Sequence, residues 1–544
     1  MVWQQLYAPI ANNVGWSALI AVIPILYFFI ALLVFRMKGH VATVTTIVLV
    51  ILDAIIGFHF PVEQALSSAI YGVFVGLWPI GWIVIGSVFL FKITVKTGHF
   101  DVIRHSISSI SQDRRIQTLL IALCLGAFLE GTAGFGAPVA IAGSMLLGLG
   151  FSPLYAAGLV LLADTAPVAF GGIGIPITAV ASVTHLSPLL LSLSVGRQLF
   201  LVSLILPFWL VTVMSGFKGL KGVWPACLTV GLVSSLSQLL VAAYLGPQLP
   251  NIVSSLLSML SLIILLRFWQ PNEIFRFKNE SAPQSFDKKH SFSRKEVFIA
   301  WGPYLSLTFF IVLWTIPAVK ELLAHATFVF SWPGLNDLVA KVAPIATHTT
   351  TLEAKFTWDL LGATGSALFI AGIAAKFICN LSWRGFGSTF KETLYELRFP
   401  LVTIACVVAF GQLMNYSGMS GTLALALAKT GVLFPLFAPI LGWIGVFLTG
   451  SDTSSNLLFG SLQQLTAQQL HLNPYLTVGA NSAGGVMGKM ISPQSIAVGT
   501  SSTGMVGKEG EVYRFTLRHS IAFLLIVSVI VLTFAYVVPS LIPA

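Results

Sequence analysis

The sequence predicts an all-α polytopic membrane protein with about 12 transmembrane helices, two re-entrant hairpins in inverted repeats, and broken helices at the midplane. Of its 544 residues, 56% are hydrophobic and only 9% are charged, with a mean hydropathy of +0.90. Apolar stretches of about 20 residues, the length of one bilayer crossing, recur from residue 14 almost to the C-terminus. The two-residue alternation of a membrane β-barrel is absent, so the spans are expected to be helices.

The basic residues indicate how the chain is oriented. The net charge is +10, and the lysines and arginines gather in a few short loops between apolar runs. Such loops lie on the cytoplasmic side of a membrane, so the charge reports topology and does not point to nucleic acid. These loops fall near residues 36–38, 92–115, 218–221, 267–295, 384–398 and 508–518.

Counting crossings between the basic loops identifies a segment that does not cross. Helices near 14–35, 41–60 and 65–91 place the N-terminus outside and the next loop inside. The segment 117–215 must then cross an even number of times, yet it contains three apolar runs. One of these runs therefore enters and leaves on the same side.

A glycine-rich stretch identifies that run. Within 117–150 the apolar sequence is interrupted by "EGTAGFGAP", whose glycines and proline favour a tight turn. Irregular backbone at membrane depth is tolerated only where it is buried in protein or lines a watery cavity. The sequence therefore predicts a re-entrant hairpin over 117–150 and a cavity at the middle of the bilayer.

The same order of elements occurs a second time. "IGVFLTGSDTSSNLLFG" at 444–460 matches the frame of "LGAFLEGTAGFGAPVAI" at 125–141, so a second hairpin is expected over 432–462. Each hairpin precedes a glycine-broken apolar segment, "DTAPVAFGGIGIP" in the first half and "NSAGGVMGKMISP" in the second. The broken helices are expected over 153–183 and 474–505.

Parity makes the two halves inverted. An odd number of spans separates the first hairpin from the second, so the second hairpin starts from the outside. We expect a first half-repeat over 1–266, a cytoplasmic linker over 267–296, a second half-repeat over 297–544, and both termini outside. The intervening spans are predicted near 153–183, 198–215, 223–245, 250–268, 297–318, 360–379 and 399–417.

Four stretches carry a family resemblance that covers essentially the whole chain. "GAFLEGTAGFGAPVAIAG", "LADTAPVAFGGIGIPI", "GSDTSSNLLFGSLQ" and "NSAGGVMGKMISPQSIAVG" resemble signature sequences of the bacterial lactate permease family, which includes glycolate permeases. The resemblance implies proton-coupled uptake of L-lactate, D-lactate and glycolate across the bacterial inner membrane. It also implies the broader group of ion-coupled transporters with two opposed hairpins, which slide a transport domain.

Few charged residues lie inside the expected membrane segments. Each costs about 2.5 to 3.5 kcal/mol at the bilayer centre, so each is a functional candidate. Glu130, Asp164 and Asp452 lie at the breaks and are the candidate proton-coupling carboxyls. Capping of a half-helix or permanent pairing with Lys489 are alternative roles for them. Asp53 lies outside the repeat motifs, where a carboxylate can simply join helices.

Lys489 is the one cation expected deep in the membrane, and it is the candidate partner of a substrate carboxylate. Amides at half-helix N-termini also attract anions, while neutralisation of Asp452 or Asp164 is the alternative role of Lys489. Serine and threonine in membrane helices often bond only to their own backbone, so the polar cluster counts for more than any member. The other candidate substrate-binding residues are Gly131, Thr132, Ser451, Thr453, Ser454, Asn456, Asn481 and Ser482.

Three classes of function compete at this point. A hydroxy-monocarboxylate:proton symporter leads, with membrane lipid as surroundings, no nucleic acid, no cofactor, no metal, and a homo-oligomer compatible with the sequence. A sodium-coupled carboxylate symporter is the alternative, because "SDTSSN" and "NSAGG" offer oxygen ligands. An intramembrane enzyme would need a nucleophile with a base or a metal cluster, and a proton-pump subunit would need ionisable residues along single helices; the sequence suggests neither.

Overall fold

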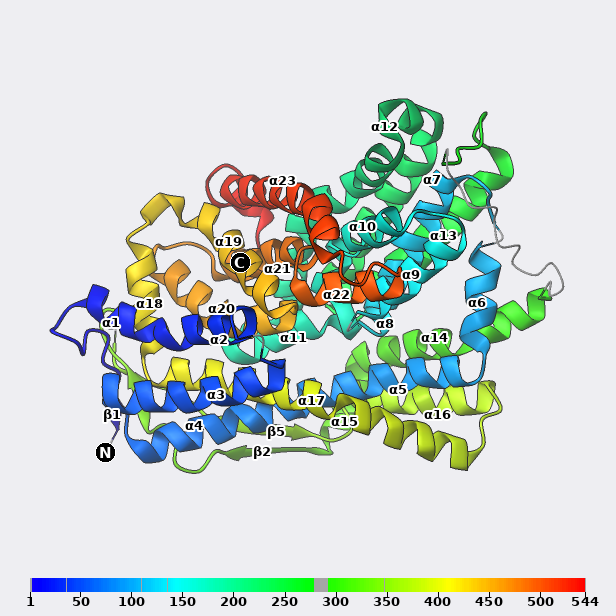
Figure 1. Ribbon diagram of the computed structural model, residues 1–544. Coiled ribbons are helices and arrows are strands. Elements are labelled where there is room, and N and C mark those ends of the chain that lie inside the picture. Colours follow the sequence, from blue (N-terminus) through cyan, green and yellow to red (C-terminus); the bar gives the residue numbers. More distant parts are fainter. Residues whose placement is uncertain are drawn as a thin grey trace.

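The computed structural model describes residues 2–35, 37–108, 110–134, 136–277, 292–346 and 348–543. Helices make up most of it, and they run roughly parallel to one another in several layers (Figure 1). Within the described ranges, eleven helices are long and apolar enough to cross a membrane. The predicted all-α polytopic membrane fold is confirmed.

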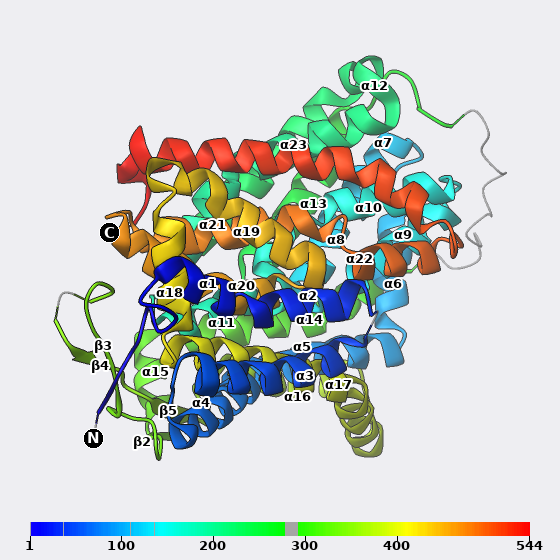
Figure 2. The same cartoon turned by 60° about the vertical axis from the view of Figure 1, so that its left-hand side comes forward.

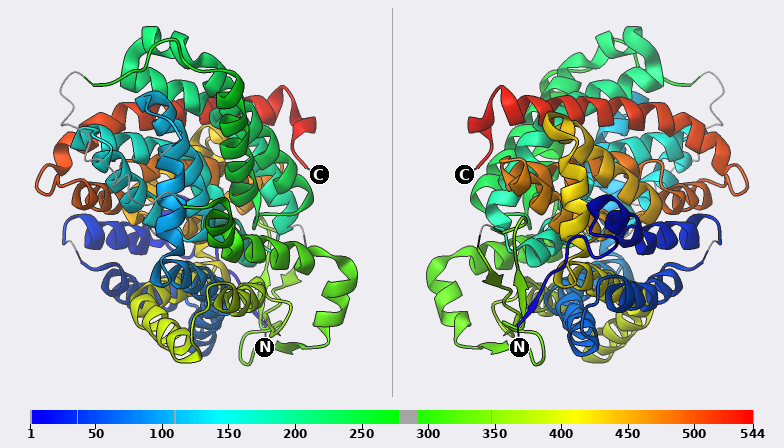
Figure 3. Two further views of the ribbon diagram at one scale, coloured as in Figure 1. Left: turned by 90° about the vertical axis from the view of Figure 1, so that its right-hand side faces the viewer. Right: turned by 90° about the vertical axis from the view of Figure 1, so that its left-hand side faces the viewer.

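The first three predicted spans form one layer of the molecule. Helices α1 (Val14–Ala21) and α2 (Ile23–Leu33) follow each other along the first span, and α3 (Gly39–Leu52) returns beside them. Helix α4 (Val62–Val75) then continues through a short π-helical segment into α5 (Trp82–Lys96). In Figure 1, α3, α4 and α5 lie in the lower part of the molecule with α1 and α2 above them, and the views of Figure 3 show these blue helices on the side away from α12 and α23.

The first hairpin is a helix, a turn and a helix, as the glycine-rich stretch predicts. A continuous helical segment runs over Arg114–Thr132 and ends in α8 (Gly126–Thr132), and α9 (Ala137–Gly148) leads back. The turn between them holds Gly134 and Gly136 at φ +58° and +85°, a left-handed backbone that side chains other than glycine rarely adopt. Phe135, within this turn, lies outside the described residues.

The base of this hairpin is fixed by a buried arginine. Asp113 Oδ1 and Oδ2 accept from Arg115 Nε and Nη2 at 3.0 and 2.6 Å. Arg115 also donates to the carbonyls of Gly219 and Glu273 at 2.9 and 2.7 Å. The start of the predicted linker 267–296 therefore packs onto the hairpin, while its residues 278–291 lie outside the described part of the chain.

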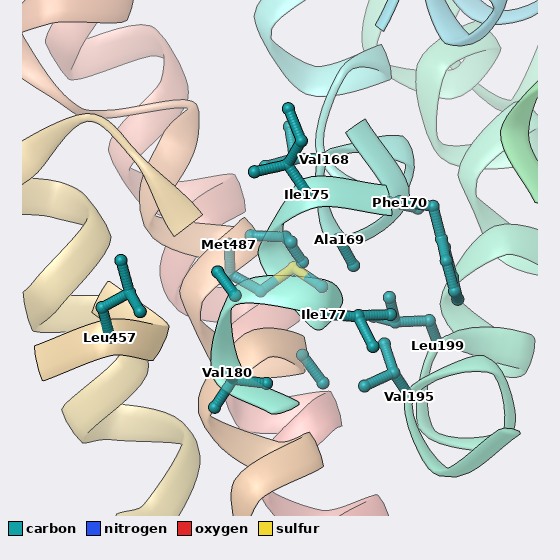
Figure 4. Close-up of a cluster of buried hydrophobic side chains, with 14 of the residues drawn as sticks. Val168, Ala169, Phe170, Ile175, Ile177, Val180, Val195, Leu199, Leu457 and Met487 are labelled. Carbon is teal, nitrogen blue, oxygen red and sulfur yellow. The ribbon is translucent and has the colours of Figure 1, made fainter. Parts of the chain in front are cut away.

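The first broken helix is interrupted where the sequence predicts. Helix α10 (Pro153–Ala163) ends at Asp164, a 3-10 turn follows over Ala166–Phe170, and α11 (Gly171–Thr184) completes the segment. Near its start, α11 has three consecutive residues of left-handed backbone, including Ile173 at φ +63°. Its apolar side chains then pack against α12 and against Met487 of the second broken helix (Figure 4).

Two predicted spans, 198–215 and 223–245, are the arms of one bent helix. Helix α12 (Pro188–Tyr244) has 57 residues and begins ten residues before the predicted start. The Ser187 hydroxyl accepts from the Leu190 N–H and so caps the first turn of α12. The predicted start rests on the run of apolar residues alone and takes no account of this cap. The arms separate at Gly216, whose φ is +69°, and α13 (Pro250–Phe268) packs beside them.

The second half begins with α14 (Arg294–Thr315), which Ser293 and Glu296 cap reciprocally. Helix α17 (Trp383–Tyr416) starts 16 residues before the predicted span 399–417. Its first turns are polar and carry Glu392 and Glu396, which form ion pairs with Lys96 and Lys92 of α5. Helix α16 (Thr364–Ile378) corresponds to the predicted span 360–379. The short helices α15 (Pro317–Ala324) and α18 (Met419–Ala428) are not predicted separately.

Two small sheets lie in the region that the sequence treats as a loop. Strand β1 (Trp3–Gln4) pairs in parallel with β3 (Val339–Lys341), which pairs with β4 (Thr350–Thr351). Strands β2 (Thr327–Ser331) and β5 (Lys355–Asp359) form a separate antiparallel ribbon. The N-terminal segment is thereby attached to the second half, and Gln5 Nε2 also donates to the Tyr416 carbonyl at 3.0 Å.

The second hairpin and broken helix follow the predicted order. Helix α19 (Phe434–Thr449) turns at Gly450 into α20 (Asp452–Gln469), so the hairpin ends at residue 469 and not at the predicted residue 462. Helices α21 (Pro474–Lys489) and α22 (Pro493–Ser502) form the broken segment, and α23 (Glu509–Tyr536) ends the helical part. In Figure 2 both hairpins and both broken helices lie between α23 above and the α3–α5 layer below.

Helices α19 and α21 pack with glycine at their crossing, which generates a first prediction. A Cβ at Gly442 would overlap the Asn481 carbonyl oxygen. We expect Gly442→Ala to lower the free energy of unfolding by about 1 to 3 kcal/mol through overpacking, measured as a lower melting temperature of purified protein. Gly387→Ala, at an exposed position of α17, is the control, because a Cβ there meets no described atom within 4 Å. Equal melting temperatures for the two variants would contradict the packing.

Candidate functional site

Four charged side chains from the two breaks come together in the centre of the molecule. Glu130, Asp164 and Asp452 are only 4%, 1% and 2% exposed. The carboxyl groups of Glu130 and Asp164 contact each other, and the Lys489 ammonium lies close enough to act electrostatically on all three acids. The structure thus gathers the charged residues that the sequence singles out at the breaks.

Each of these side chains stands at or near a helix end created by a break. Asp452 is the first residue of α20 and Lys489 the last of α21, so the helix dipoles favour both charges. Asp164 follows the last turn of α10, where the dipole disfavours a carboxylate. It therefore depends on Lys489, or on a proton shared with Glu130, for compensation.

Two glycines let the carboxyls lie directly against backbone. A Cβ at Gly171 would overlap Glu130 Oε1, and a Cβ at Gly485 would overlap Asp452 Oδ1. The sequence reading treats these glycines only as helix breakers. Their second role depends on which carboxyl lies opposite, and the glycine-rich spacing alone carries no signal for that.

A hydrogen-bond network holds Asp452. Its Oδ2 accepts from Ser482 Oγ at 2.5 Å and from Asn456 Nδ2 at 3.2 Å. Asn481 Nδ2 donates to Asn456 Oδ1 at 2.9 Å, and Gln463 Nε2 donates to Asn481 Oδ1 at 3.3 Å. Gln463 is absent from the predicted site, although a glutamine within an apolar segment could have marked it.

The network also joins the two halves of the chain. Asn456 Nδ2 lies 3.3 Å from the Pro176 carbonyl oxygen, within the first broken helix. Two further side chains of α20 donate to α11, Ser461 to the Val183 carbonyl at 3.2 Å and Gln464 to the Thr184 carbonyl at 2.9 Å. The second hairpin is therefore bonded directly to the first broken helix.

Lys489 reaches the tip of the second hairpin, where its Nζ donates to the Gly450 carbonyl at 2.8 Å. The next residue, Ser451, caps α20, because its hydroxyl accepts from the Ser454 N–H at 3.2 Å. Thr453 is half-buried beside it. An ammonium and a helix N-terminus thus lie next to each other, a combination that suits a carboxylate.

The structure shows Thr132 and Gly131 in contact with groups other than the four charged side chains. Thr132 Oγ1 donates to the Phe128 carbonyl of its own helix at 2.9 Å. A Cβ at Gly131 would lie 2.7 Å from Asn251 Cβ, so this glycine faces α13.

Asp53, which the sequence sets apart from the repeat motifs, and His185 lie outside the cluster. Asp53 follows the end of α3. His185 caps the end of α11, where burial and the charge of Lys341 lower its pKa.

The ionised cluster has an excess of negative charge. Within the described residues, Glu130 Oε2, Asp452 Oδ1 and both oxygens of Asp164 are buried and accept no hydrogen bond. Three carboxylates face one ammonium. Such a site can take up protons or another cation, and it holds an added anion only once some of that negative charge is neutralised.

Comparison with known proteins identifies the family. Residues 17–538 match the family described as L-lactate permease. The chain belongs to the L-lactate permease family. It is therefore a transport protein and not an enzyme, and the resemblance noted in its signature stretches is confirmed.

Relatives cover nearly the full chain. It is 48% identical over 553 residues to the glycolate permease GlcA of Escherichia coli (strain K12), with 99% of each chain covered. It is 47% identical to the L-lactate permease of the same organism, with 100% of both covered, and 47% identical to that of Bacillus subtilis (strain 168), with 97% and 98% covered.

A solved structure shares the fold. The transporter MtrF of Neisseria gonorrhoeae, described as illuminating a class of antimetabolite efflux pumps, matches with a TM-score of 0.52. Its sequence is 12% identical, and the match covers 92% of this permease and 96% of that chain. At this identity the likeness concerns the fold alone.

The Asp452 network generates a second prediction. We expect Ser482→Ala to destabilise the permease by about 1.5 to 3 kcal/mol, because it removes a hydrogen bond to a charged, buried group. Thermal unfolding of the purified variant measures the change. Ser454→Ala is the control, since that residue bonds to Ser451 through its backbone; an equal loss in both variants would contradict the assigned network.

Proposed function

We propose that the permease takes up L-lactate, and also D-lactate and glycolate, by proton symport across the bacterial inner membrane. The observation that carries the proposal is the buried cluster of three carboxyls and one lysine, built from both breaks. The names of the relatives, L-lactate permease and glycolate permease, support this substrate class.

The substrate's carboxylate would pair with Lys489 at the tip of the second hairpin. Its 2-hydroxyl would bond to the polar side chains that surround Asp452, mainly Ser482, Asn456 and Asn481. The N-terminal turn of α20, with Ser451, Thr453 and Ser454, would offer further donors. A carboxylate and a neighbouring hydroxyl are the two features that a 2-hydroxy monocarboxylate presents.

Protons would make the binding of an anion possible. An anion that enters an already negative cluster is repelled unless a carboxyl is neutralised first. Glu130 and Asp164 contact each other, so one proton held between them removes their mutual repulsion. Asp452 would carry or relay the proton near the substrate. Release of the substrate restores the excess negative charge only when that proton leaves as well, which couples the two movements.

The movement itself would use the two half-repeats, 1–266 and 297–544, joined by the cytoplasmic linker 267–296. Each half contributes one hairpin and one broken helix to the cluster, which supports a repeat of the two halves. Both termini would lie outside, by the count of basic loops. A transport domain that slides past the remaining helices would carry the cluster from one side of the membrane to the other.

Sodium coupling is the second candidate. The Asp452 carboxylate, the Ser482 hydroxyl and the Asn456 amide oxygen lie around one break, and such oxygens also suit Na⁺. The two candidates differ in what they require: sodium coupling needs an oxygen cage, whereas proton coupling needs a carboxyl that exchanges its proton.

Uptake of labelled L-lactate into proteoliposomes distinguishes them. We expect accumulation with the outside acidic in sodium-free buffer, and none with a sodium gradient at equal pH. Accumulation only with sodium would replace proton symport by the second candidate. No accumulation under either gradient would refute the proposed substrate.

Lys489 provides a third prediction. Lys489→Ala is expected to weaken L-lactate binding by roughly 10- to 100-fold, the loss of about 1.5 to 3 kcal/mol expected for a hydrogen bond to a charged group. Binding is measured by calorimetry on purified protein. Lys429→Ala, on the loop after α18, is the control, and unchanged affinity in Lys489→Ala would remove Lys489 from the site.

The acids provide a fourth prediction. Glu130→Gln and Asp452→Asn are each expected to abolish accumulation driven by a pH gradient, since an amide cannot take up the coupling proton. The measurement is uptake at equal protein content. Asp53→Asn is the matched control, because this acid is also in a membrane helix but stands apart from the cluster. Normal gradient-driven uptake in both site variants would refute the assignment.

A further inference from the structure

A cavity lined by both polar and apolar side chains lies beside the first break, separate from the charged cluster. It lies between the first arm of the hairpin, the 3-10 turn at Ala166 and Pro167, both arms of α12, and α13. Its volume is about 30 Å³, and because a space of about 10 to 15 Å³ can hold one water, it has room for one or two. Five serines line it, Ser203, Ser234, Ser254, Ser255 and Ser258.

The serines present acceptors to this space. Each hydroxyl already donates its proton within the protein: Ser254 to the Asn251 carbonyl at 3.3 Å, Ser255 to the Ile252 carbonyl at 3.0 Å, and Ser258 to the Ser254 carbonyl at 2.5 Å. Ser234 and Ser203 do the same toward other acceptors. The remaining lone pairs can only accept, and none of the described residues that line the cavity is a lysine or an arginine. Such a wall suits water, which donates, and repels an anion.

The cavity lies beside the elements that carry the Glu130–Asp164 pair. Ala127, which lines the cavity, and Glu130 are three residues apart in α8, so they share one face of that helix. Ala166, another lining residue, follows Asp164 by two positions. This end of the cavity therefore lies next to the helix turns that carry the two acids.

A chain of side chains forms the wall at that end. Asn251 Nδ2 donates to the Pro167 carbonyl at 2.5 Å, and Gln238 Nε2 donates to Asn251 Oδ1 at 3.2 Å. Ser203 Oγ in turn donates to Gln238 Oε1 at 2.9 Å. Gly131, next to Glu130, lies against Asn251. The chain connects the cavity lining to the open carbonyl of the break.

We propose that this cavity is a hydrated antechamber through which protons reach and leave the Glu130–Asp164 pair. Water bound to the serine oxygens relays a proton toward the pair: the water accepts a proton from the solvent side as it gives one to a carboxylate, so one O–H bond forms on the water, one breaks there and one forms on the carboxylate, and no electron is transferred. Asn251 is a positioning residue that orients the last water. The proposal rests on the proton symport proposed above, and it gives protons a route that the substrate does not use.

Filling the cavity tests the route. We expect Ser255→Leu to slow pH-gradient-driven L-lactate uptake about tenfold, about 1.4 kcal/mol on the barrier. Equilibrium exchange of labelled for unlabelled L-lactate at equal pH should stay within about twofold, because exchange needs no proton release. Ser261→Leu, on the same helix but outside the lining, should change neither rate. Equal slowing of both rates, or no slowing, would overturn the proposal.

Thiol labelling tests the hydration independently of transport. Native Cys124 also lines the cavity, so the labelling is done in a Cys124→Ala background. There we expect Ser258→Cys to react with a small, water-soluble methanethiosulfonate reagent, while native Cys227, which is buried in α12 and does not line the cavity, stays unmodified. Absence of reaction in correctly folded Ser258→Cys would overturn the proposal. If wild-type protein shows no pH-driven uptake, proton symport itself fails, and labelling still decides whether water enters the cavity.

Discussion

The rest of the structure depends on satisfying the backbone carbonyls that the two breaks leave open. Lipid offers such groups no hydrogen bond, so each needs a partner from the protein or from water. Two of these carbonyls are capped by side chains from other elements: Pro167 by Asn251 and Gly450 by Lys489. Each cap fixes one element against another, so helix breaks that would weaken an isolated helix become the points where the fold is joined.

This capping also explains why the charged residues meet. A break ends one helix and starts another, and it therefore brings a C-terminal and an N-terminal end to the same depth. The acids and the lysine stand at or near these ends, and the glycines that create the ends leave room for the carboxyls. Polar side chains that satisfy the backbone, such as Asn456, then serve the carboxyls too. Structural and chemical roles are carried by the same few residues.

Local signals in the sequence were enough for the hairpins, the breaks and the charged cluster, since glycine clusters and intramembrane charges are rare and conspicuous. They were insufficient where a helix extends beyond its apolar run. The early starts of α12 and α17 depend on a serine cap and on ion pairs with α5. Contacts between residues far apart in the sequence could not be predicted either. They include the carboxyls opposite Gly171 and Gly485, the hydrogen bond from Gln463 to Asn481, and the pairing of β1 with β3.

That last pairing bears on how the molecule is made. Trp3 pairs with Val339, and Gln5 bonds to the Tyr416 carbonyl, so these residues are synthesised long before the partners to which they bind. Contacts so far apart in sequence form late, because a long loop must close first. The N-terminal segment therefore joins the second half late in folding. Until β3 has formed, strand β1 has no partner strand.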